Sequence, residues 1–278
     1  MCGQEATNNN KSMLTALGAA AAIVVGFVSG PAAAQEIGVL EEIVVTAQKR
    51  EEALQDVPIS VATTSGMRLN ALFSGSEDVL ALSGRVPGLY AESSNGRSAP
   101  RFYLRGLGNI DFDLAASQPV SFVMDEVVME NVVLKSFPLF DVQNIEVIRG
   151  PQGTLFGRNT TAGIVKVNTR RPADDFSGYV KGSWGTFNTT NLEGAVGGGL
   201  IDGVLSARVS VLKRDRDNWI TNGFTGKESL GRYDEAASRV QVLWTPTDRF
   251  SALLLHQNRS LDGTSSIFRA NVFTSGSN

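Results

Sequence analysis

Residues 150–159 form a glycine-rich run that could cradle a phosphate, because glycines allow backbone N–H groups to approach a ligand closely. A P-loop also needs a Lys followed by Ser or Thr at the end of the run, and this chain has Gly157, Arg158 and Asn159 there. No convincing helix is expected after the run. The residues therefore argue against a nucleotide site.

Two pairs of carboxylates, Asp111 with Asp113 and Asp125 with Glu126, could serve acid–base catalysis. Such catalysis needs separated carboxylates with different pKa values that face one site. Neighbouring carboxylates in turns are more often solvated. The only histidine, His256, lies in an expected strand, where it is structural or pore-facing, and there is no Gly-x-Ser-x-Gly elbow. We therefore expect no enzyme active site, no metal site and no cofactor.

Composition narrows the class of protein further. The chain has 278 residues, 42% of them hydrophobic, and a formal net charge of -3, which does not favour nucleic acid as a partner. The single Cys2 precedes an apolar run at residues 13–28, and small residues at 29–34 suit cleavage by signal peptidase. This pattern predicts a secretory signal peptide over residues 1–34, with an N-terminal anchor as the alternative.

Residues 35–50 are expected to form a linker that contains one extended segment. Three β-branched residues in a row, flanked by charge, favour a strand at residues 41–50. An exposed strand of this kind is suited to capture by a partner that adds its own strand. The alternative interpretation is a plain first strand of the domain that follows.

Residues 51–172 are expected to form one mixed α+β domain. Alternating apolar residues predict strands at residues 57–63, 101–104, 120–124, 145–148 and 164–168. Short helices are expected at residues 65–72 and 76–82, the second with Ser76 as its N-cap. Glycines separate most of these elements.

Residues 173–278 have a different pattern, with alternating segments of about ten residues separated by turns. We expect about five strands, at residues 177–187, 191–200, 204–214, 236–245 and 250–258, with a longer polar loop at 215–232. The third is clearest, since Leu205, Ala207, Val209 and Val211 alternate with Ser206, Arg208 and Ser210. Alternation alone fits both a transmembrane β-barrel and a soluble sandwich.

Five arginines, each beside a glycine or at the end of an expected strand, need a role. They are Arg105, Arg149, Arg158, Arg170 and Arg171. One interpretation is a solvated surface. The other is that they pair with carboxylates on a surrounding wall, for which the rigid fork of donors on Arg is well suited.

The order of several short motifs resembles the N-terminal portion of TonB-dependent outer-membrane receptors. After the predicted signal peptide comes a TonB-box-like segment. The further landmarks are, in order, Val57–Val61, Val86–Leu89, Tyr103–Gly106, Ile145–Gly153, Phe156–Asn159, Ala162–Gly163 and Val167–Pro172. The residues that match the TonB box are Glu42, Ile43, Val44, Val45, Thr46 and Ala47. Those that match the plug motifs are Arg105, Gly106, Arg149, Gly150, Pro151, Gly153, Gly157, Arg158, Asn159 and Gly163.

The resemblance implies an α+β plug domain followed by the first antiparallel strands of an incomplete transmembrane β-barrel in the outer membrane. It implies active transport of a large scarce nutrient, such as an iron chelate, cobalamin or a glycan, energised by TonB. The implied partners are the periplasmic domain of TonB, outer-membrane lipid and a small-molecule ligand such as a siderophore. The plug loops near residues 93–99 and 109–116 would face that ligand.

Length is the departure from this family, because plugged barrels of about 22 strands need several hundred residues after the plug. Residues 176–278 suffice for about five strands. We expect the sequence to be an N-terminal portion of a receptor, through a sequence fragment, a frameshifted gene or a natural truncation. The alternative function is a truncated plug-only product without transport activity.

Overall fold

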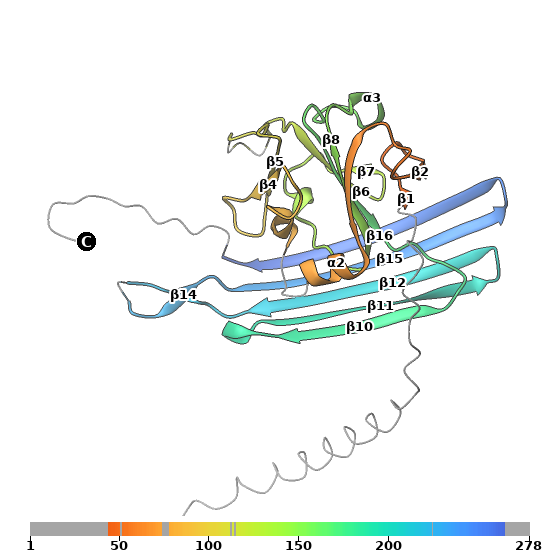
Figure 1. Cartoon of the computed structure of the whole chain (residues 1–278). Coiled ribbons are helices and arrows are strands. Elements are labelled where there is room, and N and C mark those ends of the chain that lie inside the picture. Colours follow the sequence, from red (N-terminus) through yellow and green to blue (C-terminus); the bar gives the residue numbers. More distant parts are fainter. Residues whose placement is uncertain are drawn as a thin grey trace, which may run out of the picture. The chain divides into compact units, whose positions relative to one another are not determined.

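The computed structural model of the chain describes residues 44–50, 52–73, 78–111, 113, 115–223 and 225–264. The predicted signal peptide and the box residues Glu42 and Ile43 lie outside this part of the chain. Two five-stranded sheets dominate the described residues (Figure 1). No helix in this part of the chain is long and apolar enough to cross a membrane.

The first sheet has the strand order β3-β8-β9-β6-β7. Its strands are β3 (Ser60–Ser65), β6 (Val120–Met124), β7 (Val127–Val128), β8 (Val142–Arg149) and β9 (Gly163–Thr169). Neighbours are antiparallel except β6 and β9, which are parallel. The strand predicted at residues 57–63 begins at Ser60 instead, and Pro58, which has no N–H to donate, precedes it.

Short elements surround this sheet. They are β1 (Val44–Val45), β2 (Glu52–Ala53), α2 (Gly66–Leu72), η2 (Val79–Leu82), β4 (Leu89–Glu92), β5 (Arg101–Leu104), η3 (Leu134–Ser136) and α3 (Gly153–Phe156). The helix predicted at residues 76–82 is a shorter 3-10 helix. Its N-cap is Asp78, whose Oδ1 accepts a hydrogen bond from the Leu80 N–H at 2.8 Å, rather than Ser76, which lies outside the described residues.

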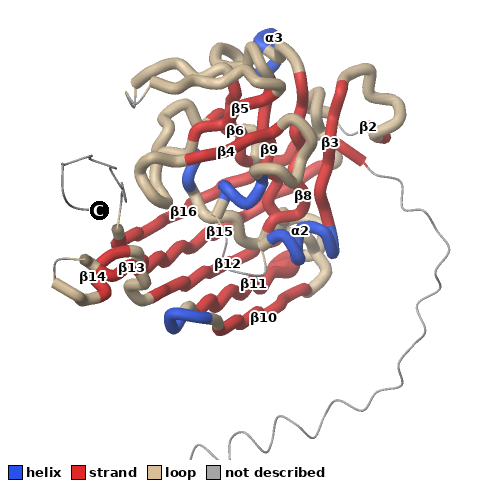
Figure 2. The backbone as a smooth tube through the Cα atoms, turned by 60° about the vertical axis from the view of Figure 1, so that its left-hand side comes forward, coloured by secondary structure: helices blue, strands red, loops and turns tan. Residues whose placement is uncertain are grey.

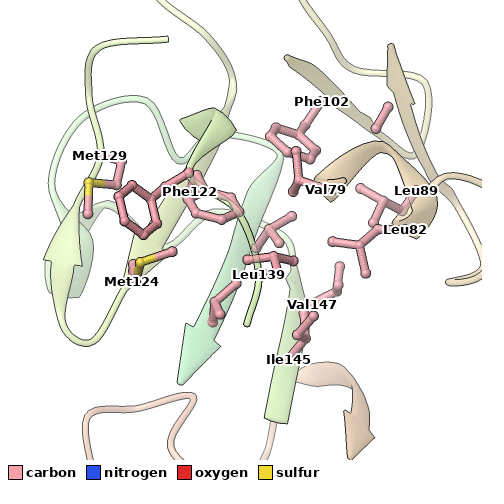
Figure 3. Packing of buried hydrophobic residues seen from close by; sticks show 14 of the residues in the cluster. Val79, Leu82, Leu89, Phe102, Phe122, Met124, Met129, Leu139, Ile145 and Val147 are labelled. Atoms are coloured by element: carbon pink, nitrogen blue, oxygen red, sulfur yellow. The ribbon is translucent and has the colours of Figure 1, made fainter. Parts of the chain in front are cut away.

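The main apolar core fills the space between the first sheet and these short elements (Figure 3). Phe102 of β5 and Phe122 of β6 stack with ring centroids 5.7 Å apart, and neither is exposed. Val79 and Leu82 of η2 pack against the same cluster. Burial of these side chains contributes most of the stability of the domain, since each large apolar side chain gains about 1.5–3 kcal/mol on leaving water.

The second sheet is wholly antiparallel, with the strand order β10-β11-β12-β15-β16. Its strands are β10 (Ser177–Trp184), β11 (Thr190–Ile201), β12 (Leu205–Arg216), β15 (Tyr233–Thr247) and β16 (Phe250–Gly263). These match the five predicted strands, with β15 and β16 extending further than expected. The loop predicted at residues 215–232 also contains a small hairpin, β13 (Ile220–Thr221) and β14 (Glu228–Leu230).

The two faces of this sheet differ in polarity. On β12, Ser206, Arg208 and Ser210 are buried, whereas Val209 and Val211 on the opposite face are 41% and 52% exposed. The buried face is turned toward the first sheet, because Leu212 of β12 and Ala237 of β15 belong to the main core cluster. Figure 2 shows the first sheet lying over this face. At β12 the sheet is therefore polar toward the domain built around the first sheet, called the inner domain below, and apolar toward the surroundings.

His256 lies on the outer, exposed face of β16, so the prediction that it could be pore-facing is wrong. Its register partner on β15 is Val240, which is 40% exposed on the same outer face. Side chains alternate along a strand, so the residues of β16 that face inward are its neighbours Leu255 and Gln257. Sequence alternation alone could not assign His256 to the outer face, because β16 carries polar residues on both faces.

Candidate functional site

The segment that matches the TonB box is folded onto the inner domain. Val44 and Val45 of β1 pair with Ala53 and Glu52 of β2. Val45 and Ala47 are fully buried, whereas Val44 is 46% exposed. The expected extended segment is present, but it is docked against its own domain rather than presented as a bare strand.

An apolar pocket on the first sheet receives the two buried side chains of this segment. Val45 and Ala47 join a second core cluster with Val57, Val123, Ile148, Phe156 and Ile164. The pocket draws on β6, β8, β9 and α3, so the glycine-rich segment contributes to it through Phe156. Apolar burial therefore holds the segment in place without help from a partner.

Thr46, between the two buried residues, is held by charged side chains. Its N–H and its hydroxyl donate to Glu146 Oε1 at 2.9 and 3.1 Å. Its carbonyl accepts a hydrogen bond from Lys166 Nζ at 2.9 Å. Asn168 Nδ2 lies 3.2 Å from the Thr46 hydroxyl and 3.0 Å from Glu146 Oε1. Thr46 thus has its backbone donor and its backbone acceptor both occupied.

A partner that binds by strand addition requires free backbone N–H and C=O groups on the captured segment. At Thr46 these groups are bound by Glu146 and Lys166, and β1 is already paired with β2. The docked segment cannot offer a continuous free edge to such a partner. Binding by strand addition would therefore require the segment to leave the first sheet.

The glycine-rich run 150–163 forms a tight turn between β8 and β9 and not a ligand cradle. The N–H of Gly150 donates to Ala162 O at 2.9 Å, and the hydroxyl of Thr160 donates to Gly157 O at 2.8 Å. Gly157 and Asn159 have φ values of 75° and 66°, a left-handed region that glycine and asparagine tolerate best. Gly153 begins the short helix α3. The positive φ values at Gly150, Gly157 and Gly163 explain why glycine is favoured at these positions of the run.

Within the part of the chain that the structure describes, Arg149 and Arg158 have partners in the inner domain and not on the wall that was the expected alternative. Arg149 donates to Ser60 Oγ at 3.0 Å. Arg158 makes two hydrogen bonds to Glu130, at 2.8 and 2.5 Å, and this pair lowers the pKa of the Glu130 carboxyl. Both pairs lie at the exposed surface of the domain.

The second sheet is joined to the inner domain by a different set of charges. Arg208 of β12 donates to both oxygens of Asp141, at 2.6 and 2.7 Å, and both side chains are buried. The inner domain therefore supplies the carboxylate, Asp141, and the second sheet, called the wall below, supplies the arginine. The expected arrangement was the reverse, with arginines on the inner domain and carboxylates on the wall. Arg97 fits the expected polarity, since it lies 3.4 Å from Glu235 of β15.

The two loops expected to face a ligand lie together in the structure. One recess beside β5 is lined by residues from both loops, namely Ser94, Asn95, Asp111 and Asp113. Arg101, which is 7% exposed, donates to Ser94 Oγ at 2.6 Å within it. Nearby, Tyr103 donates to Glu92 at 2.7 Å, and burial together with this carboxylate raises the pKa of the Tyr103 hydroxyl.

Aromatic residues mark both ends of the apolar outer face. Trp244 and Phe250 pair edge to face at one end, with ring centroids 5.8 Å apart, and Trp184 lies 78% exposed at the other. Through the strand register, Trp244 is level with Leu205 and Trp184 with Asp215. At about 3.3 Å per residue and a tilt of about 40°, this separation corresponds to about 25 Å of membrane thickness. Exposed valines, including Val196, Val209 and Val240, lie between these aromatic residues, as is typical of a strand wall in a membrane.

The comparison with known families identifies the inner domain. Residues 53–164 match the family described as TonB-dependent Receptor Plug Domain. The chain carries the plug of a TonB-dependent receptor. The match lies within the predicted plug at residues 51–172 and includes Glu146, which holds Thr46, and the whole glycine-rich turn.

Curated relatives and solved structures agree with this identification. The pesticin receptor of Yersinia pestis is 30% identical over 167 residues, which cover 59% of this chain and 24% of the relative. The ferrioxamine B receptor of Salmonella typhimurium is 28% identical over 87% of this chain and 34% of the relative. The ferric yersiniabactin uptake receptor of Yersinia pestis superposes with a TM-score of 0.67 at 25% identity, over 74% of this chain and 32% of that structure.

These comparisons confirm the predicted fold class, an α+β plug followed by the first antiparallel strands of a transmembrane β-barrel, and the outer membrane as the location. The chain spans about a quarter to a third of the length of the relatives named above. The relatives named above are receptors, which fits the expectation that the chain has no enzyme active site. The predicted domain boundaries and the roles of the individual motif residues stay predictions.

Sequence reasoning missed the residues that hold the box. Glu146 and Lys166 are each a single charge inside an apolar strand, flanked by Ile145 and Val147 in one case and by Val165 and Val167 in the other. A charge in such a position should have indicated a buried partner. The partner itself, Thr46, is 100 residues from Glu146 in the sequence, and no local pattern could have indicated it.

Proposed function

We propose that this chain is the N-terminal part of an outer-membrane receptor that imports a large, scarce nutrient with energy delivered through TonB. Residues 42–47 are the segment that TonB captures. The observation that carries the proposal is the docking of Val45, Thr46 and Ala47 on the plug, because a short docked stretch can be detached without dismantling the first sheet.

The docking also gives TonB a mechanical role. The segment joins β2 and the first sheet of the plug directly, so a pull on the captured strand acts on the plug itself. The buried pair of Asp141 and Arg208 is one of the bonds that fasten the plug to the wall, and it resists movement of the plug at that corner. We infer that a pull on the box remodels the plug while the Asp141 corner stays with the wall.

For the ligand we propose an iron chelate. Among the relatives are a ferrioxamine B receptor and a ferric yersiniabactin uptake receptor, and a vitamin B12 transporter of Vibrio vulnificus is 28% identical over 141 residues. The iron-chelate receptors cover more of this chain than the cobalamin transporter does. The recess formed by Ser94, Asn95, Asp111 and Asp113 is the proposed contact region on the plug.

A binding measurement with the box alone tests the proposed partner. A synthetic peptide of residues 41–50 is expected to bind the purified periplasmic domain of TonB, and the same peptide with Val44→Pro is expected to lose that binding. Proline removes a backbone donor and resists the pairing of a central strand. Fluorescence anisotropy of the labelled peptide gives both affinities.

A peptide in which Arg50 is changed to Lys is the matched control, since it alters a residue outside the box and keeps the charge. It is expected to bind as the unmodified peptide does. Equal binding by the Val44→Pro peptide would show that residues 42–47 are not captured as a strand, and their assignment as the TonB box would be wrong.

A further inference from the structure

Glu146 and Lys166 face each other across two neighbouring strands of the plug. They are direct register partners on β8 and β9, and neither side chain is exposed. Opposite residues in an antiparallel pair have Cβ atoms about 4.5–5.5 Å apart, close enough for an ion pair between long side chains. In the part of the chain that the structure describes, no ion pair joins the two.

Thr46 of the box takes the place of that ion pair. Glu146 Oε1 accepts the Thr46 N–H and hydroxyl, and Lys166 donates to the Thr46 carbonyl. Lys166 also pairs with Glu126 at the edge of the site. One residue of the box thus provides donors to the buried carboxylate and an acceptor to the buried ammonium.

Removal of the box would cost both charges hydrogen bonds, since Lys166 would lose the Thr46 carbonyl and keep, among the described residues, only Glu126. Glu146 would lose two of its four donors and would keep only the amides of Asn144 and Asn168. A buried charge without compensation is strongly unfavourable. The two side chains already lie opposite each other, so the simplest compensation is for them to bind each other.

We propose that Glu146 and Lys166 are positioning residues that form a two-state clamp for the box. In the docked state they hold the backbone of Thr46. In the released state they pair with each other across β8 and β9. The ion pair offsets the loss of Thr46, so the box is able to leave and return without unfolding the plug. The clamp depends on the proposed function in one respect, since it takes residues 42–47 as the segment that leaves the plug.

The test measures release of the box without TonB. In a chain with Cys2→Ser and Val44→Cys, the introduced cysteine is the only one, and a nitroxide spin label on it reports mobility at an exposed position. The decisive variant exchanges the two charges, Glu146→Lys together with Lys166→Glu. It keeps the ion pair of the released state but reverses the donors and acceptors that Thr46 needs.

The charge exchange is expected to raise the ratio of mobile to immobile label by at least about tenfold. A matched control exchanges the exposed pair Glu130 and Arg158, which lies in the same domain and does not contact Thr46. That control is expected to leave the label immobile. An immobile label in the folded Glu146/Lys166 variant would overturn the clamp.

A second variant covers the case in which the charge exchange prevents folding. Thr46→Pro removes the N–H that donates to Glu146 and leaves the plug sequence unchanged, so it is expected to release the box. Thr46→Val is its control, because it keeps the backbone donor and acceptor and is expected to shift the label much less. Equal mobility in these two variants would contradict a clamp on the backbone.

The pairing of the released state is tested by a cycle of Glu146→Gln, Lys166→Met and the double variant. If the two side chains meet only after release, the double variant has a larger release ratio than the product of the two single effects predicts. A double variant that equals that product would overturn the pairing. Because TonB is absent throughout, failure of the clamp and failure of the proposed TonB partner are separate results.

Discussion

At the scale of single residues, buried charges are concentrated where the plug holds its box and where it meets the wall. Asp141 and Arg208 are 3% and 4% exposed, and the carboxylate also accepts a hydrogen bond from Ser210. Asp141 has a φ of 50°, so the chain turns sharply at this residue just before β8 begins. The pair thus fixes one corner of the plug to β12.

Removal of the Asp141 charge is expected to destabilise the chain substantially. Asp141→Asn leaves Arg208 buried without a counter-charge, which typically costs about 3–5 kcal/mol. Urea unfolding followed by tryptophan fluorescence measures the change. Glu130→Gln, which breaks a solvent-exposed pair with Arg158, is the control and is expected to have little effect. Equal losses in the two variants would contradict a structural role for Asp141.

Lys135 provides a pH-dependent prediction. Burial lowers the pKa of its ammonium to about 8, and the Nζ donates to Val120 O at 3.3 Å. Between pH 8 and the unperturbed value near 10.5 the unfolded chain binds more protons than the folded one, so this group makes stability rise with pH. The full gain is about 3 kcal/mol.

Lys135→Met removes this dependence. We expect the variant to be more stable than the parent chain at pH 7.5, and the difference in unfolding free energy to shrink steadily toward pH 10. Urea titrations at several pH values measure that difference directly. A difference that does not change with pH would show that Lys135 keeps an ordinary pKa in the folded chain.

At the scale of elements, β9 depends on a glycine at its first residue. Gly163 has a φ of 145°, and a Cβ there would lie 2.2 Å from Ile148 O and 2.5 Å from a methyl group of Leu104. The close approach allows β9 to pair with β8 on one side and with β6, in parallel, on the other. The start of this strand therefore cannot accept a side chain.

Gly163→Ala is expected to destabilise the plug by more than about 2 kcal/mol, through both the strained φ and the contact with backbone. Gly182→Ala, in β10, is the control, since a Cβ there meets nothing within 4 Å. Thermal unfolding of both variants gives the comparison. A fully stable Gly163→Ala chain would mean that β8 and β9 are not so closely packed.

The strands of the wall were predictable from the sequence because their period of two is strong and the turns between them are short. The same pattern explains why β12 was clearest, with Val209 and Val211 on one face and Ser210 on the other. The small strands β2 and β7 were missed, since two residues carry no period. Their pairing depends on tertiary contacts instead.

The glycine motif was predictable as a turn, and the box as an extended segment, from residue types alone. The docking of the box was not, because Thr46, Glu146 and Lys166 are brought together only by the folded sheet. The prediction that the plug carries the arginines and the wall carries the carboxylates was also wrong in part. Sequence patterns show which residues are charged, but not that Asp141 faces Arg208.

At the scale of the whole molecule, the chain combines a plug with a wall whose outer face exposes many apolar side chains on β10, β11, β12 and β15. The aromatic residues Trp184, Trp244 and Phe250 bound that face at its two ends, and Val196 and Val209 lie between them. This surface matches the outer-membrane location of the receptors that resemble the chain. The polar inner face instead serves the plug.

A charge at the middle of the outer face is expected to weaken folding into lipid. Val209→Arg should cost about 2–4 kcal/mol, whereas Ile201→Arg, at the end of β11, should cost no more than about 1 kcal/mol. Urea titration of the protein in lipid vesicles measures both. Equal costs would show that Val209 does not face the hydrocarbon.

The central claim is that the box must leave the plug before TonB captures it. The most direct measurement compares the affinity of the periplasmic TonB domain for the peptide of residues 41–50 with its affinity for the intact chain, by isothermal titration. Docking reduces the fraction of chains that can bind, so the peptide is expected to bind at least about tenfold more tightly. Equal affinities, or tighter binding by the intact chain, would contradict a docked box that has to be released.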